Sequence, residues 1–245
     1  MIEHLIEKIE QLPPIPNVIS ELQNLYYYDD YNTSDIENIL KKDPNVVANI
    51  LKIANSPYYG LPREFFDIRQ AITYFGLEQI IEFAMASVVD EYLKFDLSFY
   101  DIDALDFMRF SQLKSSVAKA LVEEKLERFL VSNTAFLSDI SKSLISNYAL
   151  EKEVEPIKAK EPLNVIDEIE KERLGFDTIE VTLKMFEYWN FDKAMIDLLA
   201  NFKQSTAVKE RALFVARDIV TIDAKIDEAS LEKYPEVAEK IAQIK

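Results

Sequence analysis

The residues that could do chemistry in this chain are carboxylates, and Asp139 is the first to consider. It lies in the stretch AFLSDISKSLI, residues 135–145, directly after Ser138. The apolar residues around it predict a helix, and a His-Asp pair on such a helix would hold a metal ion for hydrolysis. Here a serine stands where that histidine would be. Asp139 is therefore either the remnant of a disabled metal site or an ordinary acid on a helix.

Composition restricts the available chemistry further. The chain has one histidine, His4, and no cysteine. An imidazole or thiolate metal site needs several such ligands at one place, and a single histidine cannot supply them. Nucleophilic sites of the Ser-His-Asp or Cys-His kind are excluded unless His4 is the base, and we interpret His4 as a surface residue. The 44 aspartates and glutamates leave a carboxylate-only Mg²⁺ or Ca²⁺ site open.

Charge and hydropathy bound the class of protein. The chain has 245 residues, at the upper end for one domain, and a net charge of −16. No run of lysine and arginine interrupts this acidity, so we expect a solvated helical surface and no nucleic-acid binding. The most apolar run, residues 80–89, is too short for a membrane span and contains Glu82. Because the chain also opens without a signal segment, we predict a cytoplasmic protein without membrane contact.

The elements that must position any site are predicted to be helices. Glycine occurs three times, which leaves few tight turns, and apolar residues recur at helical spacing along the whole chain. Three helix starts are predicted, at Ser34 with Glu37, at Asp43-Pro44 and at Asp177 with Glu180. We therefore predict an all-α fold with ten or more helices.

One segment has a different composition. Residues 151–173 carry 13 charged residues in 23, with Pro156 and Pro162 in the first half. This pattern predicts a mobile loop, because proline breaks a helix and the segment offers little apolar surface to bury. Helical periodicity on both sides favours one domain over two independent cores.

Three motifs carry a resemblance to a known family. LPPIP spans residues 12–16, DPNVVANILKIANSPYYG spans 43–60, and IRQAITYFG spans 68–76. In order and spacing they resemble the HDOD family, the HD-related output domains of bacterial signalling proteins, over residues 12–205. The resemblance implies a multi-helix bundle related to the HD-domain, phosphodiesterase-like helical core, with an N-terminal helical lobe. We place residues 1–245 in one such domain, with residues 206–245 as extra C-terminal helices.

Several motif residues are interpreted as structural. Pro57 should end the preceding helix, and Gly60 offers φ > 0 for the turn that follows. The family-motif residues of this kind are Asn55, Ser56, Tyr59, Gly60 and Gly76.

The resemblance also implies a site that has lost its ligands. Family members often carry Leu-His-Asp-Ile-Gly-Lys-Leu, and the matching residues 137–143 read LSDISKS, so only Asp139 and Lys142 remain of its polar side chains. A histidine often stands at the position of Phe110, and further histidines near Phe202 and Lys203. The remnant positions are thus Phe110, Ser138, Asp139, Lys142 and Phe202. Because each departure removes a metal ligand, we predict no metal, no cofactor and no enzymatic activity.

The placement of Asp139 on its predicted helix is a separate question. At about 100° per residue, Phe136, Ile140 and Leu144 define an apolar stripe, and Asp139 falls about 60° outside it. We therefore favour a solvated acid at the helix rim over a buried remnant. If Asp139 is buried instead, it must be hydrogen-bonded, because an unpaired buried carboxylate is costly or becomes protonated.

Three functions are compatible with these residues. The favoured one is a non-catalytic signalling module that binds an unidentified signalling protein through its N-terminal helices, at a candidate partner surface of Pro14, Ile15, Tyr27 and Tyr31. LPPIP is also read as a rigid connector between helices. The alternative is a sensor of a nucleotide or cyclic dinucleotide, with a cavity lined by Asp139, Lys142 and Arg109. Less favoured is a carboxylate-metal phosphohydrolase, since no spacing shows three converging acids.

Overall fold

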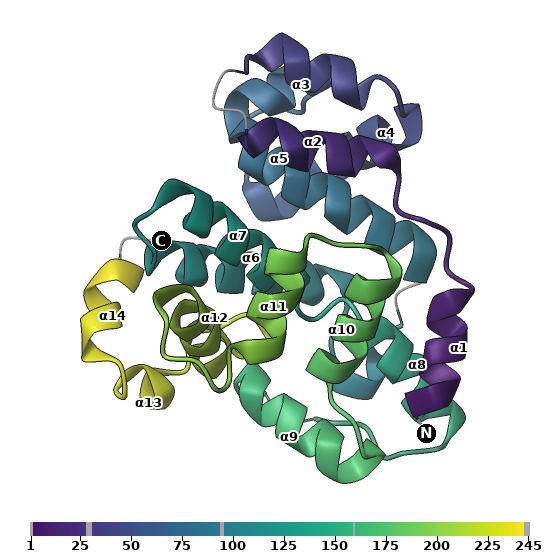
Figure 1. Ribbon diagram of the computed structural model, residues 1–245, viewed down its shortest axis with the longest axis vertical. Coiled ribbons are helices and arrows are strands. Elements are labelled where there is room, and N and C mark those ends of the chain that lie inside the picture. Colours follow the sequence, from purple (N-terminus) through teal and green to yellow (C-terminus); the bar gives the residue numbers. More distant parts are fainter. Residues whose placement is uncertain (1, 28–30, 94–95, 159, 243–245) are drawn as a thin grey trace. The chain divides into compact units, whose positions relative to one another are not determined.

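The computed structural model describes residues 2–27, 31–93, 96–158 and 160–242 (Figure 1). In this part of the chain the regular elements are helices, apart from two isolated β-bridges, Pro162 with Thr221 and Val220 with Ile226. The prediction of an all-α fold with ten or more helices is confirmed. Within the described ranges, no helix is both long and apolar enough to cross a membrane.

The chain divides into two compact units, and each is described by itself. Pro13–Leu93 is the N-terminal unit, and Met1–Leu12 with Lys94–Lys245 is the main unit. The first helix, α1 (Ile2–Glu10), thus belongs to the main unit, where it packs against α8 (Lys142–Glu151) and α10 (Thr178–Tyr188) (Figure 1). The Tyr188 hydroxyl fixes the end of α1, at 2.9 Å from the carbonyl oxygens of both Glu10 and Leu12. A single domain over residues 1–245 stays a prediction.

In its described residues, 13–27 and 31–93, the N-terminal unit has four α-helices and one 3-10 turn. They are α2 (Asn17–Tyr27), α3 (Thr33–Leu40), α4 (Pro44–Ala54), η1 (Pro57–Tyr59) and α5 (Ile68–Leu93). Asp43 caps α4 and Pro44 takes its first position, as predicted. The predicted start of α3 is two residues late, because Asn32 forms the capping box with Asp35 in place of Ser34 with Glu37.

The motif residues of this unit have structural roles. The Asn55 side chain holds the backbone of Phe65 on both sides: its Nδ2 donates to the Phe65 carbonyl at 2.8 Å, and its Oδ1 accepts from the Phe65 N–H at 2.7 Å. Gly60 ends η1 with φ 54° and ψ 34°, which confirms the expected left-handed turn. Gly76 divides α5 at a kink, with φ 77° and ψ 171°. The motif therefore shapes the loop between α4 and α5 and the bend of α5.

Alanine at Gly76 is expected to destabilise the fold more than alanine at Gly60. The conformation of Gly76 is essentially restricted to glycine and costs other residues about 1–3 kcal/mol, whereas the left-handed conformation of Gly60 costs about 1–2 kcal/mol. An added Cβ would touch nothing within 4 Å at either position, so the backbone alone sets the difference. Urea unfolding of the two variants measures it, and Gly60→Asn is the control, because asparagine tolerates this turn. Equal losses at both glycines would contradict the argument.

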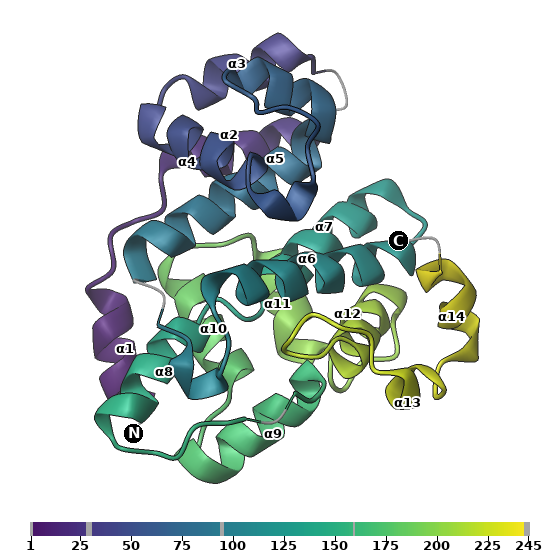
Figure 2. The ribbon, with the colours of Figure 1, turned by 180° about the vertical axis from the view of Figure 1, so that it is seen from behind.

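The main unit contains the remaining helices. After α1 they are η2 (Ser98–Tyr100), α6 (Ala104–Ala120), α7 (Lys125–Leu137), α8, α9 (Leu163–Leu174), α10, α11 (Lys193–Asn201), α12 (Val208–Ile219), α13 (Glu228–Leu231) and α14 (Pro235–Ile241). α6 and α7 lie side by side, and α12 packs against both of them and against α9 and α11 (Figure 2). Asp177 and Glu180 form the predicted capping box of α10. α12 is thus part of the core of this unit.

Two sequence predictions are corrected in the main unit. The helix predicted through residues 135–145 is two helices: α7 ends at Leu137, α8 begins at Lys142, and Asp139 lies in the turn between them. The loop predicted over 151–173 is helical in its second half, because Pro162 precedes the first residue of α9 and does not interrupt it. Leu163, Ile166 and Leu174 bury one face of α9.

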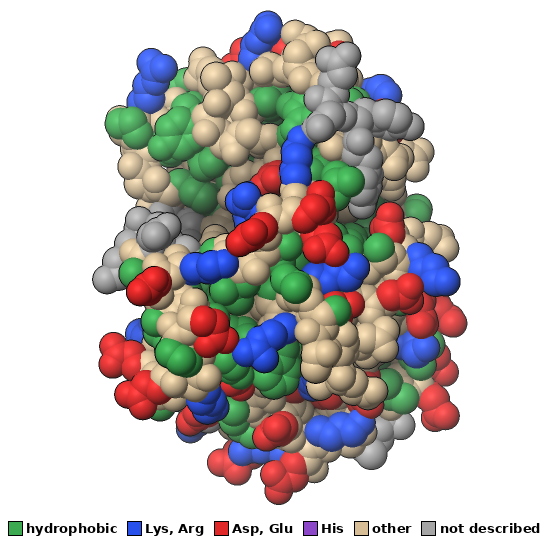
Figure 3. Space-filling model, turned by 60° about the vertical axis from the view of Figure 1, so that its left-hand side comes forward, with side chains coloured by type: hydrophobic (Ala, Val, Ile, Leu, Met, Phe, Trp, Pro, Cys, Tyr) green, Lys and Arg blue, Asp and Glu red, His purple; other side chains and the backbone are tan. Residues whose placement is uncertain are grey.

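The charged surface agrees with a solvated helical exterior. Acidic and basic side chains lie intermixed over the face shown in Figure 3. The exposed ion pairs of the protein include Lys171 with Glu180 at 2.5 Å and Lys184 with Glu187 at 2.8 Å. Pairs of this kind contribute little to stability, so the charges that matter for the site must be sought inside the molecule.

Candidate functional site

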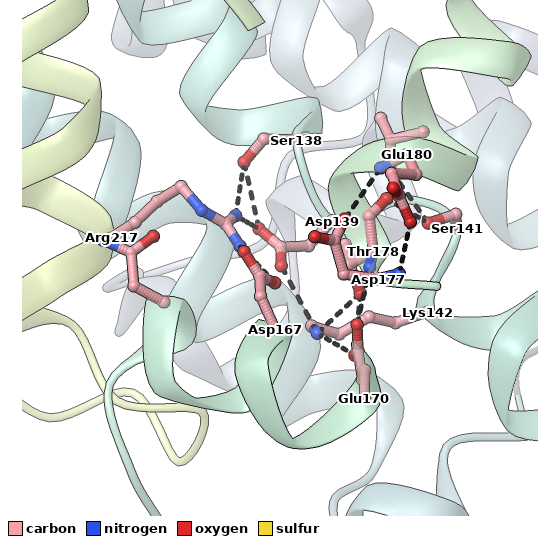
Figure 4. Close-up of polar contacts among 12 residues, drawn as sticks. Ser138, Asp139, Ser141, Lys142, Asp167, Glu170, Asp177, Thr178, Glu180 and Arg217 are labelled. Carbon is pink, nitrogen blue, oxygen red and sulfur yellow. Dashed lines mark hydrogen bonds and ion pairs between the residues drawn. The ribbon is translucent and has the colours of Figure 1, made fainter. Parts of the chain in front are cut away.

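Six charged side chains are buried together in the main unit. Figure 4 labels Asp139, Lys142, Asp167, Glu170 and Arg217. None is more than 1% exposed. Charged residues are almost never buried at this level unless they are paired. When Lys114 is protonated, the six are three cations and three carboxylates, so their formal charges cancel. This buried charge network consists of Lys114, Lys142, Arg217, Asp139, Asp167 and Glu170.

Five elements bring these side chains together. Lys114 comes from α6 and Arg217 from α12, while Asp139 lies in the turn after α7 and Lys142 opens α8. Asp167 and Glu170 are one helical turn apart on α9, on the face that also buries Leu163 and Ile166. The amphipathic packing of α6, α9 and α12 thus turns polar residues inward along with their apolar neighbours.

Arg217 joins two of the carboxylates (Figure 4). Its Nη2 donates to both Asp167 carboxylate oxygens at 2.8 Å, and its Nη1 donates to Asp139 Oδ2 at 2.5 Å and to Ser138 Oγ at 3.0 Å. Lys114 Nζ donates to the same Asp139 oxygen and, at 2.7 Å, to Ser138 Oγ. Two cations from different helices therefore share one oxygen of Asp139.

Lys142 and Glu170 form the other half of the network. Lys142 Nζ donates to Glu170 Oε1 at 2.8 Å and lies 3.6 Å from Asp139 Oδ1. Glu170 also accepts from the Thr178 N–H at 2.6 Å, the Thr178 hydroxyl at 2.8 Å and the Tyr100 hydroxyl at 2.8 Å. Lys142 Nζ further lies 4.7 Å from the centre of the Tyr100 ring, a cation–π contact. Glu170 is thus a buried carboxylate with four donors.

The network fixes the ionisation of Asp139. Burial acts to raise the pKa of this carboxyl, but the charges of Arg217, Lys114 and Lys142 outweigh burial and hold the pKa well below its usual range. The pKa of Lys142 is raised: burial acts to lower it, but Glu170 and Asp139 outweigh that effect. Burial raises the pKa of the Tyr100 hydroxyl well above 10.0, and the charge of Glu170 adds to this effect. Asp139 is therefore a carboxylate at every pH of interest.

Lys114 makes stability depend on pH above neutrality. Burial lowers its pKa from 10.5 to about 7; the attraction of Asp139 opposes this, while repulsion from Arg217 and Lys142 reinforces it. Between these values the unfolded chain holds the proton more strongly than the folded chain, so the free energy of unfolding rises with pH. We expect the urea midpoint to increase from about pH 7 to about pH 9. The same series on Lys114→Met should lose this increase, and an unchanged pH dependence would refute the assignment.

The structure places the predicted site residues as follows. The remnant positions Phe110, Ser138, Asp139, Lys142 and Phe202 all lie at or beside the network and are buried. The Phe110 ring centre is 5.6 Å from Lys114 Nζ, and the Phe202 ring centre is 5.9 Å from the Arg217 guanidinium carbon. Lys203 lies at the edge: it is 40% exposed and 3.4 Å from Asp167.

Two predictions about the site were wrong. Asp139 is fully buried, not a solvated rim acid. The angular argument failed because Asp139 lies in a turn, where helical spacing does not apply. Arg109 is exposed on α6 and is 3.6 Å from Asp106, so it does not line a cavity with Asp139 and Lys142. The basic side chains that contact Asp139 are instead Arg217 and Lys114.

Sequence reasoning missed four members of the network. They are Lys114, Asp167, Glu170 and Arg217. One signal was available: Lys114 is one helical turn after Phe110, a remnant position, and so lies on the same face of α6. Asp167 and Glu170 were assigned to the charged loop, and nothing local marks Arg217 as buried. Among the described residues, no three histidine, cysteine or carboxylate side chains are arranged to hold a metal ion.

The candidate partner residues lie in the N-terminal unit. Pro14 is exposed, and Ile15 and Tyr31 are half-buried, whereas the side chain of Tyr27 lies outside the described residues. The neighbouring Tyr26 is buried, and its hydroxyl donates to Glu78 Oε1 at 2.5 Å. Tyr26 therefore belongs to the core of this unit.

The fold is that of the helical HD-like proteins. A solved structure from Marinobacter aquaeolei, named as a candidate signal transduction protein, is similar with a TM-score of 0.64 at 15% identity, over 96% of this chain and 57% of that one. A structure from Shewanella amazonensis, named as a candidate phosphohydrolase, has a TM-score of 0.57 at 19% identity, with 98% of each chain covered. At these identities the likeness shows the fold alone.

The family follows from the sequence match. The model of the HDOD domain matches residues 12–205, and the chain belongs to the HDOD family. A Treponema pallidum protein of uncharacterised function is 29% identical over 73 residues, which is 30% of this chain and 14% of that protein. The chain thus matches a small part of that relative's length. Arg217 lies beyond residues 12–205, which the HDOD model matches, whereas the other five members of the network lie within that range.

Proposed function

We propose that this chain is a non-catalytic signalling module of the HDOD family that acts by binding a partner protein. The observation that supports the proposal is the pairing of Asp139. In the family motif this aspartate follows a metal-binding histidine, but here it accepts from Arg217 and Lys114 and lies near Lys142. The cations that neutralise this carboxylate are the protein's own.

Such a site lacks what metal-assisted hydrolysis needs. The metal must lower the pKa of a bound water and keep a coordination position open for it. The two oxygens of Asp139 face three cationic side chains, and the carboxylates of the network are at most 1% exposed. Neither a hydrated metal ion nor a substrate phosphate reaches these carboxylates without displacing a buried ion pair. The buried charge network therefore stabilises the fold, and the protein signals by binding a partner.

The protein should accordingly hold no stoichiometric zinc, iron or manganese and turn over no phosphomonoester, nucleotide or cyclic dinucleotide. Elemental analysis of the purified chain and assays with and without Mg²⁺ check this expectation. Activity that survives repurification and disappears in Asp139→Asn would contradict it and favour the hydrolase alternative.

The partner is proposed to dock on the N-terminal unit. Pro14 is exposed there and Tyr31 is half-buried, and the unit also carries Phe66, 83% exposed, and Tyr74, 60% exposed. The clamp between Asn55 and the backbone of Phe65 holds the residue next to Phe66, so this ring is presented from an ordered loop. Ordered aromatic side chains lose little entropy on binding and are frequent anchors of interfaces.

Comparative capture tests this proposal. The wild-type chain retrieves partners from its native cell extract, and quantitative mass spectrometry compares the same partners for two double variants, Tyr27→Ala/Tyr31→Ala and Phe66→Ala/Tyr74→Ala. Loss of an anchor costs ~1–2 kcal/mol or more, so we expect capture to fall about tenfold. Leu126→Ala is the matched control, because Leu126 is 44% exposed but lies in the main unit. Full capture by both double variants, with loss in a folded Asp139→Asn chain, would overturn the proposal.

A second candidate, a small-molecule sensor, is favoured by a hollow elsewhere in the main unit. This cavity of about 530 Å³ is lined by His4, Tyr148, Lys152, Val154, Arg173 and Leu174. Three of these side chains are basic and the others supply apolar surface, which suits a small anion with an aromatic part. Calorimetric titration with nucleotides and cyclic dinucleotides, on wild type and Arg173→Ala, distinguishes it from the partner-binding module.

A further inference from the structure

Arg217 is held by a set of acceptors that matches its planar fork. Two carboxylates and one hydroxyl surround it: Asp167 meets Nη2 with both oxygens, and Asp139 and Ser138 meet Nη1. The Phe202 ring lies 5.9 Å from the guanidinium carbon. Paired hydrogen bonds to carboxylates and an aromatic neighbour are the features that favour guanidinium over ammonium.

The acceptors and the donor come from different parts of the chain. Asp139, Asp167, Ser138 and Phe202 lie within the family-matched residues 12–205, whereas Arg217 comes from α12, beyond that range. The acceptors are also held without Arg217. Asp139 is fixed by Lys114 and Lys142, and Lys203 approaches Asp167 from the surface at 3.4 Å. The acceptor groups are therefore positioned by lysine contacts that do not involve Arg217, and the guanidinium of Arg217 occupies the space between them.

We propose that Ser138, Asp139 and Asp167 form a binding site for a guanidinium group, and that Arg217 of α12 is its resident ligand. This inference goes beyond the signalling function, since it holds whether or not the module has a partner. The site would also differ from an ordinary buried ion pair, because it would still prefer a guanidinium group after the side chain of Arg217 is removed.

Arg217→Ala should open this site to solutes without detaching α12. Leu213, Val215, Ala216 and Ile219 keep the helix in the core, and each is at most 1% exposed. Within the described residues, Arg217 Nε has no hydrogen-bond partner, so the site recognises only the two Nη groups. A free guanidinium ion carries those groups and can make the same bonds. It should therefore bind the variant and restore part of its stability.

The test is a thermal-melt series in guanidinium chloride at low concentration, against sodium chloride and methylammonium chloride of equal ionic strength. For Arg217→Ala we expect guanidinium alone to raise the midpoint by roughly 2–4 °C, as ligand linkage predicts for a chain of this size. Wild type, in which the site is filled, should show no rise. Arg211→Ala is the matched control, since Arg211 is on the same helix, exposed, and 2.9 Å from Glu236.

Three results would overturn the proposal. They are an equal guanidinium response in Arg217→Ala and Arg211→Ala, a rise that persists in Arg217→Ala/Asp167→Asn, and a larger rise with Mg²⁺ or Mn²⁺ than with guanidinium. If Arg217→Ala does not fold in buffer, the yield of folded monomer after refolding into each salt replaces the melt. A yield that is higher in guanidinium than in methylammonium supports the site, and equal yields overturn it.

Discussion

Asp139→Ala is expected to lower the free energy of unfolding by about 3–5 kcal/mol, the range found when one partner of a buried ion pair is removed. The carboxylate accepts from Arg217 and Lys114 and faces Lys142, and all of these groups are fully buried. Arg217 would keep Asp167 and Lys142 would keep Glu170, but Lys114 would lose its carboxylate. Three buried cations would then face two carboxylates in a site that excludes water. Urea unfolding, followed by circular dichroism, measures the loss.

Two further variants separate charge from packing at this position. Asp197→Ala, at an exposed position of α11, should change stability by no more than about 0.5 kcal/mol. In Asp139→Ala/Lys114→Met the unpaired ammonium is gone, so part of the loss should be recovered. A loss below about 1 kcal/mol for Asp139→Ala would mean that water or a rearranged side chain satisfies the cations, and the network would then be loosely packed.

Glu170→Ala should be comparably costly, about 3–5 kcal/mol, for a different reason. Glu170 accepts four hydrogen bonds, from Lys142, from the Tyr100 hydroxyl and from the N–H and hydroxyl of Thr178. Its removal takes the nearer carboxylate from the buried Lys142, which keeps only Asp139 at 3.6 Å as a counter-charge among the described contacts. It also leaves the first N–H of α10 without its acceptor. Glu170→Gln should cost less, because its amide oxygen still accepts from part of this set.

Glu168 provides the matched control for Glu170. It lies two residues earlier on α9 and is exposed, so Glu168→Ala tests the effect of losing a glutamate from this helix without touching the network. We expect a change within about 0.5 kcal/mol by the same urea titration. Similar losses for the two glutamates would show that helix propensity or surface charge, and not the buried pairing, determines the effect.

The fold could be predicted largely because its signals are local. Apolar spacing indicates a helix within a dozen residues. The cap at Asp43 was found from the adjacent Pro44, and the cap at Asp177 from Glu180 three positions away. The start of α3 was missed by two residues, because Asn32 competes with Ser34 for the same role. Gly60 was predicted correctly, since a left-handed turn after a helix favours a residue without Cβ.

The site could be predicted only in part, because its pairing is not local. Asp139 and Lys142 were found through the family motif, but their partners lie 25 to 78 residues away in sequence: Lys114, Glu170 and Arg217. Asp167 and Glu170 lie in the segment 151–173, which was predicted to be a charged mobile loop, so they were not considered as buried partners. Only the three-dimensional packing of α6, α9 and α12 shows that these charges neutralise one another inside the core.

The position of Arg217 shows that the end of the family match and the end of the folding unit are different places in this chain. The family-matched residues end at 205, yet the guanidinium that neutralises Asp139 and Asp167 is contributed by residue 217. A chain shortened to the family range would keep these two buried acids and lose the one guanidinium that joins them. Cooperative opening should therefore include α12 together with α9 and the turn before α8, so that their backbone amides exchange hydrogen as one group. The family-matched range thus ends at residue 205, whereas the cooperatively folding unit extends at least through α12.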